Sequence, residues 1–199
     1  MSNTALKKPS GSAAEKIMQV ASDLFFSQGY RATGINEIIS KSGVAKATFY
    51  AHFKSKETLC KTYLESLRVN ELLNIKRAIA AARTPMGKYL APARSLEPFL
   101  LETKFRGCPF INIASEIPNP DSPLRQEGIR VYQGIGEKIS GVCHGLVESD
   151  ANQFGYLDPE ALSQKYLLVF SGAIALAELY HDIWPVKHAV KTMQKAVAS

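Results

Sequence analysis

The chain has 199 residues, of which 46% are hydrophobic and 21% charged, an ordinary globular composition with room for one large domain or two small ones. Its net charge of +6 is unevenly spread, because residues 1–56 carry +5 and the remaining 143 residues only +1. A concentrated basic segment is typical of phosphate-binding proteins, although a solvated basic surface would look the same by charge alone.

Other features of the sequence argue against a membrane-spanning or secreted protein. The amino terminus is polar and predicts no signal peptide, and the longest apolar run, residues 166–179, is shorter than the ~20 residues that span a bilayer. Cys60, Cys108 and Cys143 are odd in number and far apart, which favours a reducing compartment over a disulfide framework. We therefore expect a cytoplasmic protein without a membrane partner.

The first helix is predicted from its caps. Residues 1–11 are polar and predict a disordered arm. Ser12 and Glu15 form a capping box, and Gly29 stands where a left-handed residue ends a helix. Between them an apolar stripe at helical spacing comprises Ile17, Val20, Ala21, Leu24 and Phe25.

The next two helices form a helix-turn-helix pattern. Thr33 is the expected N-cap of a helix that runs to about Lys41, and Gly43 supplies the positive φ of a tight turn. A third helix follows over residues 45–52. Its predicted inward residues are Val44, Phe49 and Phe53.

The rest of the chain predicts more helices. Ser55 caps a long helix to about Ala82, and Thr84-Pro85 interrupts it. Further helices are predicted over about 86–104, 110–116, 123–148, 159–182 and 185–197, with no strand pattern of useful length. The predicted fold is all-α, about nine helices, with a helix-turn-helix DNA-binding domain at 12–56 and a larger ligand-binding and dimerisation domain at 57–199.

The third helix has the dimensions of a DNA-reading element. Its eight residues span ~12 Å, and the B-DNA major groove is ~12 Å wide. Lys46 can reach a guanine edge or a phosphate, and Thr48 can contact a base, while small neighbours let the backbone approach. The free amides that begin the second helix predict a phosphate contact. The predicted DNA-binding residues are Thr33, Gly34, Ala45, Lys46, Ala47, Thr48, Tyr50, His52 and Lys56.

Residues 13–60 resemble the N-terminal domain of the TetR/AcrR family of bacterial transcriptional repressors. The resemblance rests on Gly29-Tyr30, Thr33, Gly43-Val44 and above all on the run YAHFKSKETL at residues 50–59. Ile39 stands where the family usually has a small alanine, and Ala45 and Ala47 replace a frequent serine and glycine. These departures leave the operator sequence open.

The resemblance implies a homodimer that reads a palindromic DNA operator through two heads. The long helices at 123–148 and 159–182 would form the interface. Small residues that would allow close approach are Ser171, Gly172, Ala173, Ala175 and Ala177. An intramolecular core helix is the alternative.

The resemblance also implies a small-molecule site in the second domain. An aromatic-rich set predicts an apolar or aromatic ligand, although each residue also fits a simple core. The candidate pocket residues are Leu96, Phe99, Leu100, Phe105, Phe110, Ile111, Asn112, Tyr132, Tyr166 and Phe170. Asn112 and Glu116 are candidate polar anchors. Cys108 is a candidate redox thiol or a structural cysteine.

The leading hypothesis is a repressor that a small ligand releases from its operator. An enzyme that carries a fortuitous helical head is an alternative, but the sequence contains no nucleophile elbow, phosphate loop or paired acid and base. A non-specific architectural DNA binder is another. Histidine and cysteine spacing predicts no metal site, and no cofactor is implied. Repression and activation are not distinguished.

Overall fold

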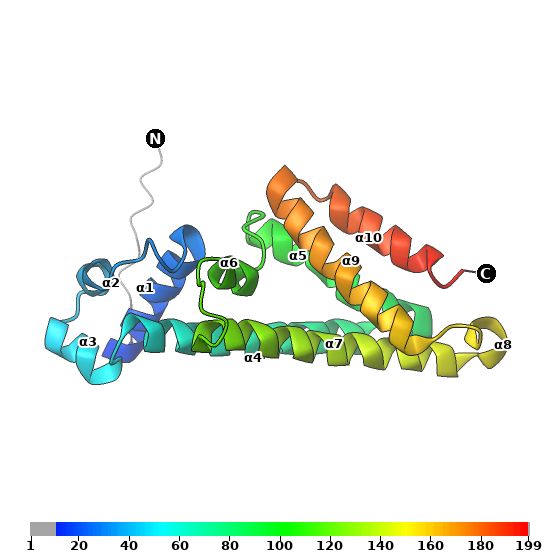
Figure 1. Cartoon of the computed structure of the whole chain (residues 1–199), viewed down its shortest axis with the longest axis horizontal. Helices are drawn as coiled ribbons and strands as arrows, with labels where there is room; N and C mark the ends of the chain where they lie inside the picture. The colour runs from blue at the N-terminus through cyan, green and yellow to red at the C-terminus, as the bar shows by residue number, and fades with distance from the viewer. Residues whose placement is uncertain (1–10, 199) are drawn as a thin grey trace. The chain divides into compact units, whose positions relative to one another are not determined.

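The computed structural model describes residues 11–198, and within them it contains ten helices and no strand (Figure 1). The all-α prediction is therefore confirmed. The chain divides into two compact units: one takes in residues up to Leu67 together with Phe110–Glu127, and the other Arg68–Pro109 together with residues from Gly128 onward. The first unit thus extends beyond the predicted 12–56 and includes a distant segment. The predicted arm, apart from Gly11, lies outside the described residues.

The first unit is built from short helices whose caps are largely those predicted. Ser12 and Glu15 form the capping box, Gly29 has φ 89° after α1, and Gly43 is left-handed after α2. Ser55 Oγ accepts a hydrogen bond from the Thr58 amide at the start of α4. The helices are α1 (Ala13–Gln28), α2 (Ile35–Ser42), α3 (Lys46–His52), the beginning of α4 (Lys56–Ala81) and α6 (Pro109–Ser115).

The predicted cap at Thr33 is wrong. The N-cap of α2 is Gly34, which provides no side-chain hydrogen bond. Thr33 is fully buried, and its hydroxyl donates instead to the Gly29 carbonyl at 2.7 Å. The loop between α1 and α2 is so tight that the hydroxyl satisfies the end of the first helix rather than the start of the second.

The second unit contains the longer helices. α9 packs against α10, and both pack against α5, as the orange, red and green ribbons of Figure 1 show. One helix was not predicted: α8 is a single turn that Asp150 caps, too short to produce a periodic pattern. The remaining elements are α5 (Pro85–Glu102), α7 (Pro123–Ser149) from Gly128 onward, α8 (Ala151–Phe154), α9 (Pro159–Tyr180) and α10 (Trp184–Lys195).

Two buried tyrosines tie this unit together. Tyr89 and Tyr166 meet edge to face with ring centroids 5.3 Å apart. The Tyr89 hydroxyl donates to the Met193 carbonyl at 3.3 Å, and the Tyr166 hydroxyl accepts from the Ala93 amide at 3.0 Å. Ala93 follows Pro92, a residue that disturbs regular bonding inside α5. The tyrosines thereby link α5 to α9 and α10.

Among the described residues α9 alone has the length and apolar composition to cross a membrane, with 22 residues and a mean hydropathy of 1.2. The apolar run at residues 166–179 is shorter than the helix that contains it, so the run alone predicted too short a span. The buried residues of α9 include Tyr166, Phe170 and Ala177, and the helix packs against α5 and α10 within the unit. Such packing is typical of the core helix of a globular protein.

Candidate nucleic-acid interface

α3 has one fully buried side chain, Phe49, and this side chain shows which side of the helix faces the core. Phe49 is 0% exposed and packs edge to face on Tyr50, with centroids 5.3 Å apart. α1 packs against both α2 and α3, so the opposite side of α3 remains open. Lys46 is exposed there and has no side-chain partner within the described residues. The other exposed residues on and beside α3 are Ala45, Ala47, Tyr50, Ala51 and His52.

The turn between α2 and α3 depends on Gly43. Its φ of 68° and ψ of 21° lie in the left-handed region, and its amide donates to the Ile39 carbonyl at 3.1 Å. Residues with a Cβ adopt this conformation at a cost of ~1–2 kcal/mol. Gly43 therefore sets the direction in which α3 leaves α2.

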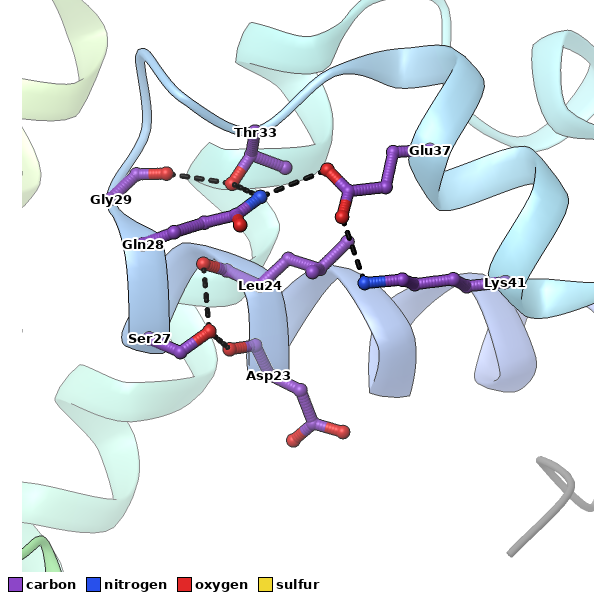
Figure 2. A network of polar contacts seen from close by, with 8 residues as sticks. All are labelled: Asp23, Leu24, Ser27, Gln28, Gly29, Thr33, Glu37 and Lys41. Atoms are coloured by element: carbon purple, nitrogen blue, oxygen red, sulfur yellow. Dashed lines mark hydrogen bonds and ion pairs between the residues drawn. The ribbon is translucent and has the colours of Figure 1, made fainter. Parts of the chain in front are cut away.

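A polar network joins α1 to α2, as Figure 2 shows. The Gln28 amide donates to the Glu37 carboxylate at 2.9 Å and contacts the Thr33 hydroxyl at 3.4 Å. Lys41 pairs with the same carboxylate at 2.8 Å. The hydrogen bonds from Lys41 and Gln28 hold the pKa of Glu37 below its ordinary value. The network links the end of α1 to the outer face of α2.

Lys56 lies against the loop between α1 and α2. Its ammonium donates to the carbonyls of Tyr30 and Thr33, both at 3.0 Å, and stands 4.4 Å from the centroid of the Tyr30 ring. An ammonium has three donors, so one N–H remains for a phosphate. The phosphate contact of Lys56 stays a prediction. Its hydrogen bonds to the Tyr30 and Thr33 carbonyls show that Lys56 also stabilises the loop, a role that the sequence pattern did not predict.

A second charged side chain holds the same loop. The Glu116 carboxylate accepts from the Tyr30 amide at 3.2 Å and from the Arg31 amide at 2.6 Å. Sequence reasoning placed Glu116 among candidate ligand anchors and missed this contact. No local pattern reveals it, because 85 and 86 residues separate the partners.

The predicted DNA-binding residues all lie in the first unit, and all of them except Thr33 are exposed or half-buried. Thr48 and Lys56 are half-buried, and Gly34 is exposed. The side chain of Thr33 is fully buried, so only its backbone neighbourhood can take part in DNA contact. Arg31, which the prediction omitted, is an exposed cation on the same loop.

The ten candidate pocket residues are divided between the two units. Phe110, Ile111 and Asn112 belong to the first unit. In the second unit Leu96, Leu100, Tyr166 and Phe170 are core residues, and Phe105 stacks on His181 with centroids 4.9 Å apart. The hydroxyl of half-buried Tyr132 donates to Cys108 Sγ at 3.7 Å. Phe99 lines a cavity of about 580 Å³ between α4 and α5.

The three thiols differ in environment. Cys60 and Cys143 are fully buried, and burial raises the pKa of each to about 12, so neither is a ready nucleophile. Cys108 is half-buried. Across residues 11–198 no group of three histidine, cysteine or acidic side chains is placed to hold a metal ion.

This arrangement, a buried three-helix core with an exposed short helix after a glycine turn, defines a helix-turn-helix DNA-binding protein. Residues 17–62 match the model of the bacterial regulatory proteins of the tetR family. The HTH-type transcriptional regulator YxaF of Bacillus subtilis is 28% identical over 160 residues, 74% of this chain and 79% of that protein. The HTH-type transcriptional repressor DhaR of a Mycobacterium species is 24% identical over 192 residues, 92% of this chain and 91% of that protein.

The likeness extends to solved structures over nearly the whole chain. The crystal structure of a TetR-family transcriptional regulator from Streptomyces coelicolor superposes with a TM-score of 0.78, at 24% identity, over 94% of this chain and 96% of that one. The chain belongs to the TetR family: it is a DNA-binding transcriptional regulator and not an enzyme.

Proposed function

We propose that the protein is a sequence-specific transcriptional repressor, a homodimer that a small ligand releases from a palindromic operator in the bacterial cytoplasm. The observation that carries this proposal is the exposed side of α3, where Lys46 stands between two alanines after the Gly43 turn. Lys46 and Thr48 are the base-contacting candidates, and Gly34, Tyr50, His52 and Lys56 the candidates for phosphate contact. The name of the relative DhaR supports repression.

The second unit offers a place for the ligand. The cavity between α4 and α5 exists because both helices carry small residues there, among them Ala78, Ala81, Gly87 and Ala91. These residues leave space that larger side chains would fill. A volume of about 580 Å³ is within the range of small-molecule sites.

The charge of the lining narrows the ligand class. Two acidic residues, Glu71 and Glu102, and two basic residues, Arg77 and Arg94, line the cavity. Glu71 alone among these four is not exposed, and burial raises the pKa of its carboxyl. It has no ion-pair partner among the described residues. Phe99 lines the same cavity and offers an aromatic face. These features support an amphipathic ligand with a cationic group and an apolar body, rather than a wholly apolar one.

The helix α4 provides a route from ligand to DNA. The last part of α4 lines the cavity, from Glu71 to Ala81, and its earlier residues Leu59, Tyr63 and Leu64 are buried. A ligand that favours one position of this helix would bias the positions of both heads in the dimer. DNA affinity then falls when the two heads no longer fit successive major grooves.

The direct test is selection of duplexes from a random DNA pool, followed by titration of the selected sequence. We expect a palindromic consensus bound in a salt-sensitive way and more tightly than random DNA by a factor of about 10³ or more. Equal affinity for random and selected duplexes would favour a non-specific architectural binder instead.

A further inference from the structure

The loop between α1 and α2 is held by side chains from distant parts of the chain. Lys56 donates to the carbonyls of Tyr30 and Thr33, and Glu116 accepts from the amides of Tyr30 and Arg31. A cation thus meets carbonyl oxygens and an anion meets amide hydrogens, the pairing that makes hydrogen bonds strong. The Thr33 hydroxyl closes the loop from within by donating to the Gly29 carbonyl.

Glu116 is itself held in place. It follows α6, and the turn after that helix is closed by hydrogen bonds from the Glu116 and Ile117 amides to the carbonyls of Ile113 and Ala114. The Arg125 guanidinium donates to the Ile117 carbonyl at 3.0 Å. The carboxylate therefore approaches the loop from a braced segment.

Gly29 fits this arrangement. Its φ of 89° already favours glycine, and a Cβ added there would collide with the Glu116 carboxylate. The loop backbone and the carboxylate are thus in close contact. The segment that carries Glu116, residues 110–127, continues at both ends into the second unit.

We propose that Glu116 is a positioning residue for DNA recognition. It contacts no DNA itself, but fixes the loop that carries the exposed Arg31 and ends at Gly34, the N-cap of α2. The inference rests on the proposed function, since it assumes that this unit reads DNA. It makes a segment of the sequence far from the helix-turn-helix a determinant of operator affinity.

The test uses the full-length protein and the duplex that the wild type selects from a random pool. Glu116→Ala is expected to raise the Kd for this duplex roughly tenfold, because charge-assisted hydrogen bonds are lost. The dependence of Kd on salt should stay unchanged, since no phosphate contact is removed. Glu116→Gln should give an intermediate Kd, because its amide oxygen can still accept one hydrogen bond. Asp121→Asn, the same change of charge at an exposed position of the same segment, should bind like the wild type.

Hydrogen exchange followed by NMR separates positioning from general stability. In Glu116→Ala the amides of Tyr30 and Arg31 should exchange faster, while those of the α1 core keep their wild-type rates. Faster exchange with an unchanged Kd would overturn the proposal, and so would faster exchange throughout the unit. If the wild type selects no duplex, the proposed function fails, whereas unchanged exchange at Tyr30 and Arg31 refutes the contact itself.

Discussion

At the scale of single residues, lysines that look alike in the sequence have different surroundings. Lys46 is exposed without a side-chain partner among the described residues, whereas two donors of Lys56 are engaged by loop carbonyls. The free lysine is the better candidate for a base contact. The engaged one contributes to the stability of the unit as well as to its charge.

These surroundings lead to different expected effects of substitution. Lys46→Ala should weaken binding to the selected duplex by about 1–3 kcal/mol and leave the affinity for random DNA nearly unchanged. Lys56→Ala should weaken binding to all duplexes alike and also lower the free energy of unfolding by about 1–3 kcal/mol. Fluorescence anisotropy and urea unfolding measure the two effects. Equal losses on selected and random duplexes for Lys46→Ala would make it a phosphate contact.

Glu37 gives a prediction for pH. Hydrogen bonds from Lys41 and Gln28 lower the pKa of its carboxyl in the folded protein below the ordinary value of 4.5. The contribution of Glu37 to the free energy of unfolding is therefore present above pH 4.5. It is lost as the pH falls through the lower pKa that this carboxyl has in the folded protein. The stability difference between the wild type and Glu37→Gln should shrink as the pH falls from 6 to 3, which thermal unfolding can follow. A difference that does not depend on pH would contradict this.

At the scale of helices, the residues that begin or end a helix are close together in the sequence, whereas the residues through which two helices meet are not. The sequence predicts Thr84-Pro85 as the end of the preceding helix, and the structure also begins α5 at Pro85 with Thr84 as its side-chain cap. α9 likewise begins at Pro159 with Asp158 as its side-chain cap. The cavity between α4 and α5 follows instead from which small residues of the two helices face one another. Periodicity within either helix does not show that juxtaposition.

The cavity between α4 and α5 is predicted to prefer a cationic ligand. Benzyltrimethylammonium should bind the wild-type protein roughly tenfold more tightly than neopentylbenzene, its neutral isostere, because Glu71 and Phe99 favour a cation. Glu71→Gln should remove the preference. Glu102→Gln, which changes an exposed carboxylate of the same lining, should largely retain it. Calorimetric titration measures both ligands, and equal affinities in the wild type would contradict a cation site.

At the scale of the whole molecule, α9 presents an apolar stripe to the outside. Leu168 and Leu179 are each 75% exposed, and Leu176 is exposed between them. Of the small residues predicted to permit close approach, Ala173 and Ala177 face the core, whereas Ala175 is exposed and half-buried Gly172 has open space beside it. A second copy packed on this stripe would cover the exposed leucines, which supports the proposed homodimer.

Substitution on the stripe tests the dimer. The double variant Leu168→Glu, Leu179→Glu should sediment with half the mass of the wild type, because two charges cannot be buried in an apolar interface. Leu101→Glu, at a leucine that is 54% exposed on α5, should sediment like the wild type. The monomeric double variant should also bind the operator more weakly than the wild type, since one head reads a single half-site. A wild type that sediments as a monomer would contradict the interface.

The sequence by itself determined the helical fold, most helix starts, the turn at Gly43 and the exposed side of α3. These features depend on neighbours within a few residues, so spacing and capping chemistry reveal them. Only the tertiary structure decided that Thr33 is buried, that Lys56 and Glu116 hold the loop between α1 and α2, and that residues 110–127 join the DNA-binding unit. The contacts of Lys56 and Glu116 join residues that are 23 to 86 positions apart in the chain and meet only when it folds, a relationship that no local pattern encodes.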